Sequence, residues 1–356
     1  MNSLTLAAPR EHVHKRTITE YHDISAFERL AQEWDELTTL SATSSPFLTR
    51  QWQKNWWNCF HHHRALRILT IDDENGRPCG IAPLYTHEKE GAHTLMLLGS
   101  RDLCDYLDFI VAPSREAYFY HTLLSHLASS TPTPAALCLN SIPHSSPTLH
   151  YFKDFAHRRG YTLEIHVEDT SPSLPLPSTF ESYLTSLSQK NRHEIRRKTR
   201  KVTRGKALTF KKIDNPSQLV STMPSFLRLF RASAGEKSTF LTSQRERFFL
   251  TIAEECSRLG WIELFALSLD AEEVAYLFCL HYQDTLYLYN SAYDPTYAFL
   301  SPGIVVLTYC LEDAINRGIK QFDFLRGSEP YKYHFGAHDH ALYTLTLHLP
   351  GEKRYA

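Results

Sequence analysis

The strongest constraint on the fold is the stretch 287–336, in which a strand, a helix and a second short strand follow one another. Alternating polar and apolar residues over 285–290 predict a strand, because neighbouring side chains of a strand point to opposite faces. Apolar residues recur at three- and four-residue steps over 304–315, which predicts a helix with one buried face. Ser301 is expected as the N-cap of this helix and Pro302 as its first residue.

The turn between this strand and helix is a candidate site for an anionic ligand. The first N–H groups of a helix lack partners within the helix, and the helix dipole is positive at that end. A pyrophosphate group suits such a turn. The alternative is a plain Ser-Pro helix start with no ligand.

Composition and charge set wider limits on the 356-residue chain. Its length allows two domains, and its 38 Lys+Arg residues nearly balance its 39 Asp+Glu residues, so overall charge does not indicate a polyanion-binding protein. The seven Cys residues are scattered without a CxxC pair, which favours reduced thiols in the cytoplasm. We expect no signal peptide at the start of the chain and no transmembrane segment.

Two clusters invite a metal interpretation, and we predict no metal site at either. His61, His62 and His63 are consecutive, so they fan around a helix or alternate on a strand and cannot share one ion well. Asp102, Asp105 and Asp108 follow at steps of three, but no Gly and Glu follow at the offsets of a calcium loop. We interpret Asp105 and Asp108 as acceptor-binding residues, with structural roles as the alternative.

The order of predicted elements is the same in both halves of the chain. Each half gives two strands joined by a turn, a third strand, a loop, a helix and a further strand. We favour duplication over coincidence among common α/β patterns. A proline-rich stretch at 168–178 predicts a linker, which gives a domain at 1–167 and a domain at 179–356.

A helix predicted over 179–204 has a strongly basic second part. The segment 190–206 contains nine cations and the single acid Glu194; the cations are Lys190, Arg192, Arg196, Arg197, Lys198, Arg200, Lys201, Arg204 and Lys206. A solvated helix face, a docking surface for a phosphate-bearing ligand, and a surface for RNA or an anionic membrane are the three interpretations. We favour the phosphate-bearing ligand and assign Lys190, Arg192 and Arg196 to substrate binding.

The second half resembles a known family. The basic helix and the motifs FDFLRG (322–327) and YKYHFG (331–336) are similar to the acetyltransferase-like family of the GNAT superfamily that includes BioF2-like and cellulose-biosynthesis CelD-like proteins. This family is related to the Fem aminoacyltransferases. The LLGSRDLCDYLDFIV segment (97–111) is similar to the first half of the family. The resemblance implies an α/β (α+β) fold of two tandem GNAT-like units, with mixed, mostly antiparallel sheets flanked by helices.

The resemblance also implies an acyltransferase with acyl-CoA, or an acylated carrier protein, as co-substrate and no tightly bound cofactor. The expected donor-binding residues are those of the turn: Leu300, Ser301, Pro302, Gly303, Ile304 and Val305. The usual GNAT pyrophosphate signature is absent there, and only Gly303 matches it. We expect the first half to have lost donor binding and to shape the acceptor side.

Acyl transfer needs a base for the amine, an acid for the leaving group and stabilisation of an oxyanion. The candidates are Asp323 as base or ion-pair partner, Arg326 for an anionic group, Lys332 for the transition state and Tyr289 as acid. Tyr331, in the same motif as Lys332, is assigned to substrate binding.

We therefore predict a cytoplasmic N-acyltransferase that acts on an amine of a sugar, an amino acid or a cell-envelope or polysaccharide precursor. One alternative is a Fem-like aminoacyltransferase that uses charged tRNA, the one nucleic acid that the prediction admits. The other is a non-catalytic partner in polysaccharide biosynthesis.

Overall fold

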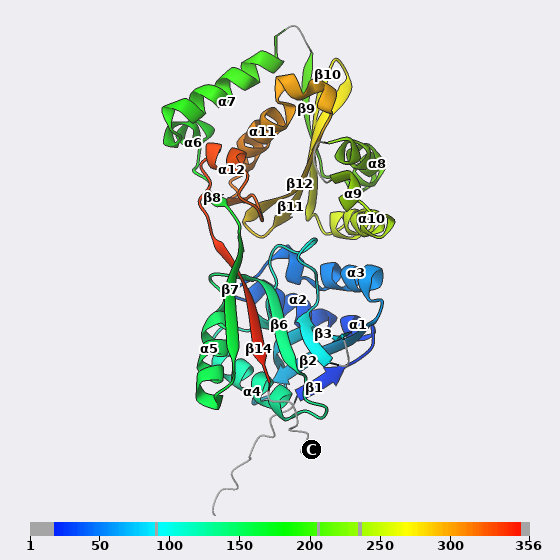
Figure 1. The fold of residues 1–356 in the computed structure, drawn as a ribbon. Coiled ribbons are helices and arrows are strands. Elements are labelled where there is room, and N and C mark those ends of the chain that lie inside the picture. Colours follow the sequence, from blue (N-terminus) through cyan, green and yellow to red (C-terminus); the bar gives the residue numbers. More distant parts are fainter. Residues whose placement is uncertain (1–17, 90–91, 205–206, 234–236, 350–356) are drawn as a thin grey trace, which may run out of the picture.

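A computed structural model describes residues 18–89, 92–204, 207–233 and 237–349 of the chain. The amino-terminal segment, for which the sequence predicts no signal peptide, lies outside these residues, as does Lys206 of the basic run. Within the described part of the chain, no helix is long and apolar enough to cross a membrane. Figure 1 shows two sheets one above the other, each flanked by helices.

The first half builds most of the first sheet. Its elements are β1 (Ile18–Tyr21), α1 (Ala26–Arg29), α2 (Ala31–Leu40), η1 (Pro46–Leu48), α3 (Arg50–Phe60), β2 (Arg64–Asp72), β3 (Pro78–Lys89), β4 (Ala92–Leu97), β5 (Ile110–Val111), α4 (Glu116–Ser129), β6 (Ala136–Pro143), α5 (Pro147–Arg159) and β7 (Leu163–Thr170).

The second half builds most of the second sheet. Its elements are β8 (Ser173–Pro175), α6 (Phe180–Ser186), α7 (Gln189–Val202), β9 (Leu208–Ile213), α8 (Pro216–Ala232), α9 (Lys237–Phe240), α10 (Ser243–Ser257), β10 (Ile262–Leu269), β11 (Glu272–Tyr282), β12 (Thr285–Tyr293), η2 (Pro295–Leu300), α11 (Pro302–Asn316), β13 (Gln321–Asp323), α12 (Pro330–His334) and β14 (Ala341–His348).

The two halves repeat one topology. The order β1-β2-β3-β4-β6 in the first sheet matches β9-β10-β11-β12-β13 in the second. In each half the last two of these strands are parallel, and the other neighbours pair antiparallel. A parallel pair needs a crossover connection, and α4 and α11 provide it in the two halves. The fold is therefore a tandem duplication with mixed, mostly antiparallel sheets, as the sequence predicts.

Each sheet also contains a strand from beyond the expected boundary. β14 lies in the first sheet between β6 and β7, and Figure 1 shows this red strand beside the green ones. β8, from the stretch expected to be a linker, pairs with β13 in the second sheet. The division into 1–167, 168–178 and 179–356 stays a prediction, but the hydrogen bonds of the two sheets cross it twice.

An aromatic cluster packs the two halves together. Trp52 of α3 makes edge contacts with Phe248 of α10 and with Tyr289 of β12, at ring-centroid distances of 5.4 and 5.2 Å. The Asn55 amide of α3 donates to the backbone oxygen of Phe248 at 3.2 Å. The core is thus continuous between the halves, and residues of both can form one site.

The predicted single helix over 179–204 is two helices. Leu187 has an extended backbone (ψ 152°) and ends α6, and Ser188 begins α7 by accepting the N–H of Asn191. The N-cap of α6 is Thr179, which accepts the N–H of Ser182. The break allows α7 to lie along α11, as Figure 1 shows.

Gly80 of β3 gives a test of packing in the first half. A Cβ at this position would lie 2.3 Å from the Phe119 ring of α4, and Phe119 is fully buried. We expect Gly80→Ala to lower the free energy of unfolding by about 1–3 kcal/mol, the usual cost of overpacking. Chemical denaturation would measure it, and Phe119→Leu should recover part of the loss. If the double variant instead lost the sum of the two single-variant losses in free energy of unfolding, the contact between Gly80 and Phe119 would be contradicted.

Candidate active site

The predicted donor-binding turn lines a cavity of about 260 Å³ beside β12. β12 pairs with β13 from Thr285 to Tyr287 and then continues alone on that side to Tyr293, so the two strands open into this space. The lining residues are Leu277, Leu288, Ser291, Ala292, Tyr293, Ala298, Ser301, Pro302, Gly303, Ile304, Leu307 and Tyr331. Leu300 and Val305, also predicted here, are buried in the core instead.

The first turn of α11 offers fewer N–H groups than the sequence suggests. Ser301 occupies the N-cap position, but with a left-handed backbone (φ 55°) and no capping hydrogen bond from its side chain. Pro302 has no N–H group, and the N–H groups of Ile304 and Val305 both donate to the Ser301 carbonyl, at 3.1 and 3.3 Å. Only the Gly303 N–H is left for a ligand.

A second space, a cleft of about 670 Å³, lies between the halves. The first half contributes the loop after β4, and the second half contributes α8, α9, α10, β12 and the segment 324–332. The lining residues are Arg101, Asp102, Asp105, Phe230, Thr239, Phe240, Arg245, Leu288, Tyr289, Asn290, Ser291, Phe324, Leu325, Arg326, Glu329, Tyr331 and Lys332. Leu288, Ser291 and Tyr331 line both spaces, so the cavity and the cleft meet at these residues.

Arg326 ties the two halves together at the floor of the cleft. Its Nε donates to Asp105 Oδ1 at 3.2 Å, and its Nη2 donates to Ser141 Oγ at 2.6 Å. Its Nη1 forms an ion pair with Glu168 of β7. The nitrogen atoms of the guanidinium group are therefore already bonded to side chains of the first half. We expect Arg326 to act on a substrate indirectly, by holding Asp105 in position.

Asp105 is a carboxylate that faces the cleft. Its side chain is 17% exposed, and Oδ2 has no hydrogen-bond partner among the described contacts. Burial raises the pKa of this carboxyl group, and the charge of Arg326 opposes that shift. A carboxylate with a raised pKa and a free oxygen can accept a proton at neutral pH.

Asp323, the predicted base, has both carboxylate oxygens occupied. Oδ1 accepts the Leu325 N–H at 2.7 Å, and Oδ2 accepts the hydroxyl of Tyr106, from the first half, at 2.7 Å. Burial raises its pKa to about 7, partly offset by the Tyr106 hydrogen bond. It is not among the residues that line the cleft. Its contacts therefore anchor the segment after β13.

Lys332 is buried and holds a turn. Its ammonium group donates to the carbonyls of Leu325, Arg326 and Gly327 at 2.9, 2.7 and 2.9 Å, and it lies 2.9 Å from a Glu329 carboxylate oxygen. These contacts fix the backbone where Leu325 has a positive φ of 57°. The side chain lines the cleft, but its hydrogen bonds are already used.

Of the other predicted residues, Tyr289 lines the cleft and Asp108 does not. Tyr289 lies at a bulge of β12 and donates its hydroxyl to the Leu103 carbonyl at 3.1 Å. Asp108 is buried in the first half, where it accepts the hydroxyls of Ser146 and Thr148 at the start of α5. The structure therefore does not bring Asp108 to the cleft, and the start of α5 explains its carboxylate.

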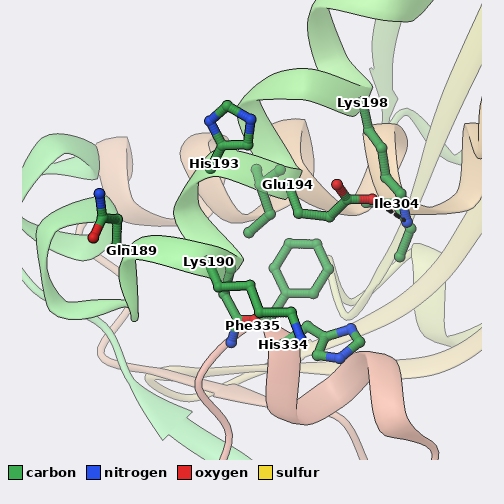
Figure 2. A pocket seen from close by; sticks show the side chains of 10 residues that line it. Gln189, Lys190, His193, Glu194, Lys198, Ile304, His334 and Phe335 are labelled. Carbon is green, nitrogen blue, oxygen red and sulfur yellow. Dashed lines mark ion pairs between the residues drawn. The ribbon is translucent and has the colours of Figure 1, made fainter.

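The cations predicted on α7 do not line the cleft. Arg192 donates to the carbonyls of Leu184 and Thr185 at 3.4 Å. Arg196 pairs with Glu181 at 3.2 Å. Lys190 lines a separate groove beside α12 (Figure 2).

Sequence reasoning missed part of the cleft wall. Arg245 of α10 forms an ion pair with Asp102 and donates to the Phe240 carbonyl at 2.9 Å. Arg101 reaches Glu168 at 3.2 Å. Neither arginine belongs to a motif, and only the packing of the two halves brings them here.

Among the described residues, no group of three or more His, Cys, Asp or Glu side chains could hold a metal ion.

Comparisons with known proteins agree with this geometry. Residues 189–333 match the family model of the acetyltransferase (GNAT) domain. The match contains β12, α11 and β13, and every residue that lines the cavity beside β12 lies within the matched range. A comparison with curated proteins found no match.

Solved structures show the same fold over most of the chain. FemX is similar with a TM-score of 0.64 and 13% identity, over 92% of this chain and 96% of that one. L-PGS from Bacillus licheniformis gives a TM-score of 0.54 and 10% identity, over 90% and 93% of the two chains. A protein of unknown function from Bacteroides thetaiotaomicron gives 0.55 and 10%, over 89% and 97%. At these low identities, the TM-scores establish a shared fold and nothing further.

Proposed function

We propose that the protein is a cytoplasmic N-acyltransferase that uses an acyl-CoA donor, with an acyl carrier protein as the alternative donor. The observation that carries this proposal is the junction of the donor cavity with the cleft at Leu288, Ser291 and Tyr331. A thioester in the cavity would present its carbonyl carbon to an amine in the cleft. We infer that the first half supplies acceptor contacts, since its loop provides Arg101, Asp102 and Asp105.

The reaction uses Tyr331 at this junction and Asp105 in the cleft. The neutral amine nitrogen attacks the thioester carbonyl carbon, an amide bond forms, and the carbon–sulfur bond breaks. Asp105 accepts the proton that the nitrogen loses, and Tyr331 donates a proton to the leaving thiolate. Exchange with solvent restores both groups. Burial raises the pKa of the Tyr331 hydroxyl, so the hydroxyl carries its proton at neutral pH.

We place the acceptor among amines of sugars, amino acids or precursors of the cell envelope and its polysaccharides. The cleft has charges of both signs in the Asp102–Arg245 and Asp105–Arg326 pairs, which suits a polar acceptor. A panel of such amines, assayed by release of CoA thiol from acetyl-CoA, would identify it.

Donor binding is the first test. A ligand that binds only the folded protein at 100 times its Kd should add about 2.7 kcal/mol to the free energy of unfolding. We expect acetyl-CoA and CoA to raise the melting temperature and Gly303→Trp to abolish that rise. A Cβ at Gly303 would meet nothing within 4 Å, so the indole should fill the cavity without disturbing the core. No shift with any CoA compound would contradict this donor.

Tyr331→Phe tests the leaving-group role. We expect kcat to fall by up to about 10²-fold, because the thiolate would leave without a proton. The melting-temperature rise with CoA should stay as in the wild type, because the ring is kept. An unchanged kcat would remove Tyr331 from the reaction.

A second candidate function is aminoacyl transfer from a charged tRNA. The exposed cations of α7 and the FemX-like fold favour it. Transfer from aminoacyl-tRNA that is lost on ribonuclease treatment, together with no response to CoA, would select it. Binding of neither donor would favour a non-catalytic partner in polysaccharide biosynthesis.

A further inference from the structure

A groove of about 470 Å³ runs along α7 next to α12 and the first turn of α11 (Figure 2). Its lining residues are Gln189, Lys190, Asn191, His193, Glu194, Ile195, Lys198, Ile304, His334 and Phe335. Ile304 also lines the donor cavity. The groove and the donor cavity therefore adjoin at Ile304.

The lysines of this groove outnumber its carboxylates. Figure 2 shows Lys190 and Lys198 extending from α7 toward His334 and Ile304. Glu194 is the one carboxylate in the lining, and Arg197 holds its two oxygens at 2.7 and 2.8 Å. Lys198 is 3.5 Å from Glu194, and Lys190 has no carboxylate partner within 4 Å among the described residues.

The floor of the groove is apolar. Ile195 and Phe335 are 4% and 1% exposed, and the imidazoles of His193 and His334 lie at its edges. A hydrated inorganic anion would make no favourable contact with such a floor. A nucleotide would place its base and sugar on the apolar floor and its phosphates beside the lysines.

The α11 turn explains why a donor would need these side chains. A helix start normally holds phosphates with several N–H groups, and here the Gly303 N–H alone is left. Charged side chains nearby must then supply the missing donors. Lys190 and Lys198 are the cations of the groove that adjoins Ile304.

A second groove on α7 does not adjoin the donor cavity. It has a volume of about 570 Å³ and includes Arg192, Arg196 and Arg200. None of its lining residues lines the donor cavity. A donor seated at Gly303 therefore reaches the lysine groove first.

We propose that the groove between α7, α12 and the first turn of α11 binds the phosphorylated nucleotide end of a CoA-type donor. Lys190 and Lys198 bind its phosphates, while the thioester arm lies in the cavity at Gly303. This inference rests on the proposed donor. It assigns α7 to donor binding through two lysines and not through its arginines.

Titration calorimetry with CoA, dephospho-CoA and pantetheine at one salt concentration tests this assignment. We expect Lys190→Ala/Lys198→Ala to bind CoA at least about tenfold more weakly, because each lysine loses a charge-assisted phosphate contact. Pantetheine, which has no phosphate, should bind the variant and the wild type equally. Lys190→Arg/Lys198→Arg should keep CoA affinity within a few fold.

Arg200→Ala/Arg204→Ala is the matched control, because it removes two exposed cations of the same basic segment outside the groove. Its affinity for CoA should be unchanged. An equal loss in this control, an equal loss of pantetheine binding, or no loss in the lysine variant would each overturn the inference and leave the donor intact. Failure of the wild-type protein to bind CoA would overturn the proposed donor, and the inference with it.

Discussion

Asp105→Asn is expected to lower kcat/KM for acyl transfer by about 10²–10⁴-fold, the range in which a general base contributes. The amide cannot accept the proton that the attacking amine must lose. Asparagine keeps the shape of the side chain and an oxygen for the Arg326 Nε, which lies 3.2 Å from Asp105 Oδ1. Release of CoA thiol from acetyl-CoA with a responsive amine would measure the loss.

The pH profile separates a base from a purely structural carboxylate. Burial raises the pKa of Asp105, and a base acts only when deprotonated, so wild-type kcat/KM should fall as pH drops through that raised pKa. The Asn variant should lack this dependence. Asp102→Asn is the control for the pH profile, because it removes a carboxylate of the same loop that is 54% exposed and paired with Arg245. It can weaken acceptor binding but should keep the fall of kcat/KM at low pH. Loss of that pH dependence in both variants, or full activity in Asp105→Asn, would place the base elsewhere.

The sequence predicted the local elements and the duplication because both depend on short-range patterns. Alternation over 285–290 and the helical spacing over 304–315 each report one element and one buried face. Repeating such elements in the same order was enough to predict two similar halves. The cap signal was less reliable, since Ser301 lies at the N-cap position of α11 with a left-handed backbone and without a capping hydrogen bond from its side chain. The break at Leu187 was not predicted from the helical spacing.

The strand exchange could not be read in this way. Whether β14 pairs within its own half or with β6 and β7 depends on contacts between residues far apart in the chain. The Arg326 network has the same character, because Asp105, Ser141 and Glu168 come from separate elements of the first half. The sequence offered Arg326 as a residue for an anionic substrate, whereas the structure gives its charge to carboxylates of the protein.

Equivalent positions in the two halves serve different purposes. The segment after β12 lines the donor cavity, from Ala298 to Ile304. The segment after β4 instead packs Leu103 and Leu107 inward and turns Asp102 and Asp105 toward the cleft. The two equivalent segments therefore line different spaces, which supports the proposal of donor binding in the second half and acceptor contacts from the first.

Lys332→Ala is the second variant for which a large effect is expected, and its stability decides how the residue acts. The sequence suggested a transition-state role, which predicts lost turnover in a protein of normal stability. The structure shows an ammonium group with three backbone carbonyl partners. Removing it leaves buried acceptors without donors, and each costs about 1–3 kcal/mol. We expect a loss of about 3 kcal/mol or more in the free energy of unfolding.

Turnover should also fall in this variant, because the 325–327 turn positions Arg326 and, through it, Asp105. Lys332→Met is the matched control, since it keeps the aliphatic stem and removes only the ammonium group. If the hydrogen bonds to the turn are what matters, both variants should lose stability and turnover together, as denaturation and thiol-release assays would show. Variants with wild-type stability and no turnover would instead return Lys332 to direct catalysis, and the turn would then hold its shape without it.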